Sequence, residues 1–184
     1  MMNLPPLKTL ILGGVRSGKS RYAAELAGLL GPQVTLIATG TAQDEEMAAR
    51  IEAHRKKRPP HWTVVEEPVQ LAAALEAAAA PHRVVVVDCL TLWLSNLLGL
   101  EDEAALRREC AHLIEQLPAL PGHCILVSNE VGFGIIPANA LARRFGDEAG
   151  LLHQRLAAQC DRVVLMAAGL PLELKSAPAD AAAP

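Results

Sequence analysis

Short apolar runs alternate along this chain with longer stretches in which apolar residues recur at helical spacing. The runs are rich in Val, Leu and Ile with few polar positions, which is typical of strands buried on both faces. They lie at 7–12, 34–38, 83–88, 123–128 and 162–167. Strands that alternate with helices predict an α/β fold, a mostly parallel sheet of the P-loop NTPase type with helices on both faces.

The intervening stretches predict helices, and a weaker run at 62–66 predicts one more strand. The expected helices cover 21–30, 44–57, 68–80, 90–99, 102–117 and 138–159. We expect an interruption of the last helix near Gly146, because glycine is a poor helix former. The stretch 172–175 is a candidate for an antiparallel edge strand.

The 184 residues suffice for one domain with a real core, and we assign 1–175 to a single nucleotide-binding domain. Only 3% of the residues are aromatic, so Ala, Val, Leu and Ile must build that core. The Ala/Pro-rich tail 176–184 is expected to be disordered.

Residues 13–20 fit the phosphate-binding pattern G-x-x-x-x-G-K-[ST], with a strand predicted before and a helix after. Glycines let the loop backbone curl until its N–H groups converge on phosphates, and the helix N-terminus adds partial positive charge. Lys19 can reach the β- and γ-phosphates, and the Ser20 hydroxyl can ligate Mg²⁺. The alternative is a chance glycine turn, which the strand–loop–helix context disfavours.

Other polar residues follow the predicted strands, where ligands bind in parallel sheets. Asp88 can hold Mg²⁺ opposite Ser20, although a helix cap is an alternative role. The segment 39–41 and the pair Asn129 and Glu130 should lie at the same edge. That pair could face the γ-phosphate or a hydroxyl acceptor, or form only a turn.

On a helical wheel, Met47, Ile51 and His54 share one face of the helix expected over 44–57. A histidine there is either a buried side chain with satisfied nitrogens or a nucleophile that forms a phosphoramidate. The basic run 55–58 could neutralise triphosphate charge or simply be solvated. Glu66 could accept hydrogen bonds from guanine or ribose, or be a solvated strand end. The other five histidines receive no role.

Charge and composition narrow the function classes further. The net charge of −3 gives no general attraction to nucleic acid. The four cysteines are widely spaced and form no C-x-x-C pair, which is typical of a reduced, cytoplasmic protein. No run of 18 apolar residues is present, so we expect no membrane span.

Together, several segments resemble the bifunctional adenosylcobinamide kinase/adenosylcobinamide-phosphate guanylyltransferase family of cobalamin biosynthesis. The similar segments are 13–21, 37–39, 44–62, 129–137 and 143–157. The resemblance implies phosphorylation of the aminopropanol hydroxyl of adenosylcobinamide by GTP or ATP, with Mg²⁺. It also implies GMP transfer from GTP to that phosphate, giving adenosylcobinamide-GDP and pyrophosphate. The family carries the GMP on a histidine that falls on His54, and it forms homotrimers.

The resemblance also places the nucleotide contacts on particular residues. They fall on Gly13, Gly14, Val15, Arg16, Ser17, Gly18, Lys19, Ser20, Ala38, Thr39, Gly40, Arg55, Lys56, Lys57, Arg58, Glu66 and Asp88.

The chain departs from the family pattern at three positions. Val15 replaces a common Ala, Asp88 stands where some members carry Glu, and His153 stands where Asn is expected. The shorter acid at Asp88 affects the expected metal or nucleotide contact, and the role of position 153 stays open.

Two other functions compete with this interpretation. An ordinary P-loop small-molecule kinase would use Lys19, Ser20 and Asp88 but leave His54 idle. A GTP-binding switch would need a guanine-reading element, and the chain has no N-K-x-D motif.

Overall fold

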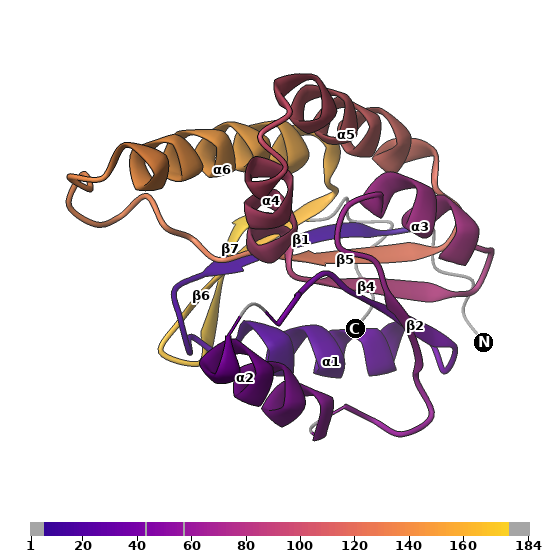
Figure 1. Cartoon of the computed structure of the whole chain (residues 1–184). Helices are drawn as coiled ribbons and strands as arrows, with labels where there is room; N and C mark the ends of the chain where they lie inside the picture. Colours follow the sequence, from indigo (N-terminus) through magenta and orange to yellow (C-terminus); the bar gives the residue numbers. More distant parts are fainter. Residues whose placement is uncertain (1–5, 43, 57, 177–184) are drawn as a thin grey trace.

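The computed structural model describes residues 6–42, 44–56 and 58–176. Within them, one sheet has the strand order β3-β2-β4-β5-β1-β6-β7, in which β1 to β6 run parallel and β7 is antiparallel (Figure 1). The strands are β1 (Lys8–Gly13), β2 (Val34–Ala38), β3 (Thr63–Glu66), β4 (Val84–Asp88), β5 (His123–Val127), β6 (Arg162–Ala167) and β7 (Leu170–Lys175). The predicted α/β fold is confirmed.

The helices cover both faces of the sheet (Figure 1). They are α1 (Lys19–Leu30), α2 (Glu45–Lys56), α3 (Leu71–Ala78), α4 (Leu90–Gly99), α5 (Glu103–Gln116) and α6 (Ala140–Gln159), with a short 3₁₀ turn η1 (Leu117–Ala119). Val85 and Val87 pack toward α3, α4, α5 and α6, whereas Val84 and Val86 pack on the α1 side. Because successive strand side chains alternate between faces, the valine run of β4 fills both cores.

Most predicted elements are found within a few residues of their expected bounds, including the antiparallel edge strand, which begins at Leu170. The predicted interruption near Gly146 is wrong, because α6 is continuous from Ala140 to Gln159. The helix penalty of one glycine is about 1 kcal/mol. Leu152 and Leu156 are buried in the core, and their packing offsets that cost. Of the predicted tail, 177–184 lies outside the described residues.

The four cysteines are free, as predicted, and three of them are buried. Among the described residues, no helix is both long and apolar enough to cross a membrane.

At the amino ends of β1 and β5, two titratable side chains are buried together. Lys8 Nζ donates to the carbonyl oxygens of Leu120 and Gly122 at 2.6 and 2.7 Å. His123 Nδ1 accepts the Leu7 N–H at 3.2 Å, so this nitrogen carries no proton. Burial lowers the pKa of His123 below its usual value, and the nearby charge of Lys8 lowers it further.

This arrangement predicts acid sensitivity. With the folded-state pKa depressed, the unfolded chain binds more protons as pH falls through the usual histidine range, so the free energy of unfolding decreases. We expect chemical denaturation to show lower stability at pH 5.5 than at pH 7.5. The His123→Asn variant, which keeps an acceptor for the Leu7 N–H, should lose less on acidification. Burial also lowers the pKa of His153, so the stability of the His123→Asn variant should still decrease somewhat on acidification. An equal loss of stability between pH 7.5 and pH 5.5 in wild type and variant would contradict the prediction.

Candidate functional site

The predicted phosphate loop lies between β1 and α1, and two of its glycines, Gly13 and Gly18, pack closely against other backbone. Gly13 has a φ of +152°, and a Cβ there would lie 2.5 Å from the carbonyl oxygen of Met166. Gly18 has a φ of +100°, and a Cβ would lie 3.2 Å from the Cα of Gly169. A side chain at Gly13 would therefore push β1 away from β6, and both positions favour glycine conformationally.

Lys19 begins α1 with a buried side chain whose Nζ donates to the Gly14 carbonyl oxygen at 2.7 Å. Burial lowers the pKa of Lys19, while the nearby Cys89 and Asp88 act in the opposite direction. The loop lysine and the acid at the end of β4 are thus close enough to interact. An anionic phosphate would replace the carbonyl as a stronger, charge-assisted partner for the ammonium.

The other loop residues divide into an exposed tip and a buried base. Gly14, Val15 and Arg16 are exposed, and Ser20 is half-buried in the first turn of α1. Ser17 Oγ is buried without a hydrogen-bond partner in the part of the chain that the structure describes. The tip is therefore open to a ligand.

The carboxyl ends of the central strands meet beside this loop. The Glu130 N–H donates to the Gly13 carbonyl oxygen at 2.9 Å, and the Thr39 N–H donates to the Asp88 carbonyl oxygen at 3.3 Å. Ala38 pairs with Asp88 on one side and with Glu66 on the other. The strand pairing thus aligns the predicted contacts that come from β2, β3 and β4.

Two residues expected at this edge, Thr39 and Asn129, tie the strand ends together through Cys89 and Thr91, which the sequence did not single out. Thr39 Oγ1 donates to the Cys89 carbonyl oxygen at 2.7 Å and accepts the Cys89 N–H at 3.0 Å. Asn129 Nδ2 donates to Thr91 Oγ1 at 2.8 Å. These bonds fix the ends of β2, β4 and β5 relative to one another.

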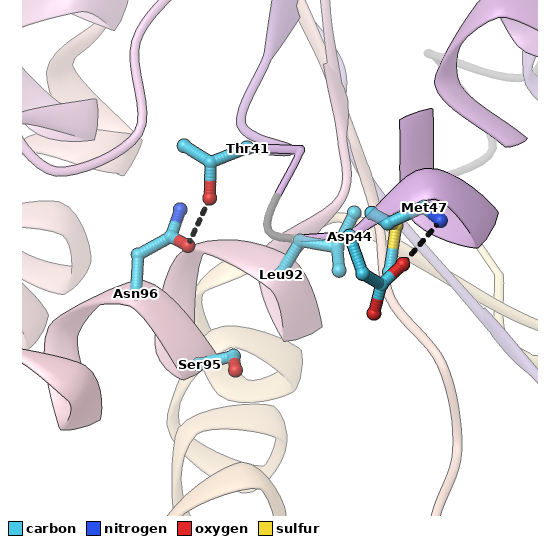
Figure 2. A pocket seen from close by; sticks show the side chains of 6 residues that line it. All are labelled: Thr41, Asp44, Met47, Leu92, Ser95 and Asn96. Atoms are coloured by element: carbon cyan, nitrogen blue, oxygen red, sulfur yellow. Dashed lines mark hydrogen bonds between the residues drawn. The ribbon is translucent and has the colours of Figure 1, made fainter. Parts of the chain in front are cut away.

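The segment between β2 and α2 is held against α4 by Asn96 (Figure 2). Asn96 Nδ2 donates to the carbonyl oxygens of Thr39 and Pro68 at 2.8 and 3.0 Å, and its Oδ1 accepts the Thr41 hydroxyl at 3.1 Å. A cavity of about 70 Å³ lies beside this contact. It is lined by Thr41, Asp44, Met47, Leu92, Ser95 and Asn96.

Helix α2 contains the predicted nucleophile His54 and the first two residues of the basic run 55–58. The side chains of His54 and Lys56, and the whole of Lys57, lie outside what the structure describes. Arg55 Nη2 donates to Glu66 Oε1 at 2.6 Å, and both side chains are exposed. Two predicted nucleotide contacts thus pair with each other across α2 and β3. Arg58 is half-buried after the helix.

A further cluster lies at the end of β5 and joins Glu130, which was expected at this edge, to Ser128 and His153, to which the sequence assigned no role. Ser128 Oγ is 2.7 Å from His153 Nε2, and His153 Nδ1 is 3.7 Å from Glu130 Oε2. Glu130 Oε1 accepts the Gly132 N–H at 2.6 Å. Burial lowers the pKa of His153, and the Glu130 charge opposes this shift. The sequence indicated only that Ser128 ends a central strand and that Glu130 follows it.

The fold is similar to that of several solved structures. The flagellar accessory protein FlaH from Methanocaldococcus jannaschii aligns with a TM-score of 0.51 at 14% identity, covering 95% of this chain and 80% of that one. The ATPase domain of G40P aligns with a TM-score of 0.50 at 14% identity, covering 88% and 69%. At these identities the likeness concerns the fold alone.

Sequence comparison is more specific. The bifunctional adenosylcobalamin biosynthesis protein CobP of Pseudomonas aeruginosa is 52% identical over 94% of this chain and 99% of its own length. The corresponding CobU of Escherichia coli is 42% identical over 90% and 98%. The family described as cobinamide kinase / cobinamide phosphate guanyltransferase matches residues 9–174. With nearly the whole chain matched, this protein belongs to the cobinamide kinase / cobinamide phosphate guanyltransferase family.

Proposed function

We propose that this protein phosphorylates the aminopropanol hydroxyl of adenosylcobinamide and then transfers GMP from GTP to the new phosphate. The observation that carries the proposal is the convergence of Lys19, Asp88 and Glu130 at one edge of the sheet, in a chain that belongs to this family. Family membership supplies the substrate class, and the loop geometry supplies the phosphate site.

In the kinase step, the acceptor oxygen attacks the γ-phosphorus and a nucleoside diphosphate leaves. Such a transfer is accelerated by positioning and by charge stabilisation, with little covalent chemistry for the protein to perform. The backbone N–H groups of the exposed loop tip would bind the phosphate oxygens, and Lys19 would exchange its carbonyl partner for the β- and γ-phosphates.

The residues of this edge fit Mg²⁺, which prefers oxygen ligands and usually keeps several waters. Ser20 would offer its hydroxyl and Asp88 its carboxylate, and the ion when bound would neutralise phosphate charge. No cluster of three or more His, Cys, Asp or Glu residues suited to a metal occurs among the described residues. A hydrated ion that relies mainly on the triphosphate needs no such cluster.

In the transferase step, a neutral nitrogen of His54 would attack the α-phosphorus of GTP and release pyrophosphate. The phosphate of the corrinoid would then attack the same phosphorus, break the P–N bond and regenerate the histidine. Both steps would use one triphosphate cradle, and they would differ in which phosphorus is attacked.

Incubation with α-³²P-GTP and Mg²⁺ tests the covalent step. Wild type and the matched control His61→Ala should acquire label that is stable in base and lost in acid, as a phosphoramidate is. The His54→Ala variant should acquire none while still binding GTP. An unlabelled wild type would indicate a simple kinase, and a labelled His54→Ala variant would place the nucleophile elsewhere.

Glu66 is proposed to read the guanine base. A carboxylate can accept the N1–H and N2–H donors of guanine, which adenine lacks at those positions. A hydrogen bond to a charged group contributes about 1.5–3 kcal/mol. Glu66→Gln should therefore weaken GTP binding about tenfold to hundredfold and leave ATP binding nearly unchanged, as measured by titration calorimetry. Equal losses for the two nucleotides would contradict base recognition by Glu66.

A further inference from the structure

The end of β5 occupies a special place in the sheet. β5 lies between β1, which leads into the phosphate loop, and β4, which ends at Asp88. The backbone of Glu130 donates directly to Gly13, the first residue of the loop motif. Residues that follow β5 are therefore next to the loop on its Asp88 side, where the γ-phosphate and an acceptor must meet.

Ser128, His153 and Glu130 form a chain of polar contacts at this position. Ser128 is fully buried, His153 is 7% exposed, and the side chain of Glu130 is 17% exposed. The order hydroxyl, imidazole, carboxylate matches that of a serine hydrolase triad. No substrate can reach the Ser128 hydroxyl, however, so the serine is not a nucleophile. The end that solvent and substrate can reach is the carboxylate.

The contacts define which atoms carry protons. A neutral imidazole has one N–H, and placing it on Nδ1 points it at the Glu130 carboxylate, while Nε2 accepts the Ser128 hydroxyl. The opposite tautomer would turn the Nδ1 lone pair toward a negative charge. Because 3.7 Å exceeds hydrogen-bond length, His153 orients and stabilises Glu130 Oε2 without occupying it. Oε1 is held by Gly132, which leaves Oε2 available to accept a proton.

Building on the function proposed above, we propose that Glu130 is the general base of the kinase step and that His153 is its positioning residue. As the acceptor oxygen forms its bond to the γ-phosphorus, the bond from that phosphorus to the bridging oxygen of the nucleoside diphosphate breaks. The hydroxyl proton passes to Glu130 Oε2. The GMP transfer has a phosphate as acceptor, which brings no hydroxyl proton to remove, so that step does not need Glu130.

Measuring the kinase and transferase reactions separately distinguishes a general-base role of Glu130 from a structural role. Glu130→Gln should lower kcat for adenosylcobinamide phosphorylation about 10²- to 10⁴-fold, the usual contribution of a general base. GTP binding and GMP transfer to preformed adenosylcobinamide phosphate should stay within threefold of wild type. Glu115→Gln, an exposed glutamate of α5, is the matched control and should leave both rates unchanged. Glu130→Asp, which keeps the charge, should lose less kinase activity than Glu130→Gln.

A kinase kcat unchanged in Glu130→Gln would overturn the proposal. An equal loss of both half-reactions would also overturn it, because Glu130 would then belong to the nucleotide cradle. Failure of the proposed function itself looks different: wild type would phosphorylate no adenosylcobinamide, or would transfer no GMP to its phosphate.

The role of His153 is tested with two variants, because the side-chain amides of Asn and Gln replace different nitrogens of the imidazole ring. Asn places an amide donor near the Nδ1 position, facing Glu130, whereas Gln places its amide near Nε2, facing Ser128. His153→Asn should keep kinase kcat within about threefold, and His153→Gln should lower it about tenfold with little change in KM. Equal kcat values for the two variants would reject the positioning role, and melting temperatures would be compared to confirm that both are folded.

Discussion

The site depends on the parallel pairing of three neighbouring strands. β4, β5 and β1 run in one direction with matched registers, so their carboxyl ends reach the same edge of the sheet. Backbone bonds continue beyond the strands, as in the Ser128 N–H that donates to the Ile11 carbonyl oxygen at 2.9 Å. The phosphate loop, Asp88 and Glu130 are then held at one place by backbone hydrogen bonds, independently of their own side chains.

The edge of the sheet where these strands end buries polar groups, and each of these groups needs a hydrogen-bond partner. A buried group left without one costs about 1–3 kcal/mol. Thr39 meets this requirement with two bonds to Cys89, and Ser128 does so through His153. At the same edge, Asn129 is restrained by its bond to Thr91, and Glu130 is restrained by Gly132 and lies beside His153. Stability and preorganisation of the edge therefore have a common physical origin.

The sequence alone was sufficient for most of the fold and for the phosphate loop, because buried parallel strands are continuous apolar runs and the loop has a strict local pattern. Gly146 does not interrupt α6, because the tertiary packing of this helix outweighs the poor helix propensity of one glycine. The contact between His153 and Ser128 joins residues 25 positions apart on different elements, and no local pattern encodes it. The pairing of Arg55 with Glu66 likewise arises only when α2 lies across β3.

The proposed general base Glu130 and the proposed nucleophile His54 lie on parts of the fold that are held with different firmness. Glu130 follows a fully buried strand and is bonded to the loop it serves, which suits a base that must meet one hydroxyl at one phosphorus. His54 lies on α2, where no residue with a described side chain is buried and none is part of the two hydrophobic core clusters. Helices with little buried surface are the elements that can shift at low free-energy cost. A nucleophile that serves the α-phosphorus only in the second step benefits from that freedom, whereas a base for the first step does not.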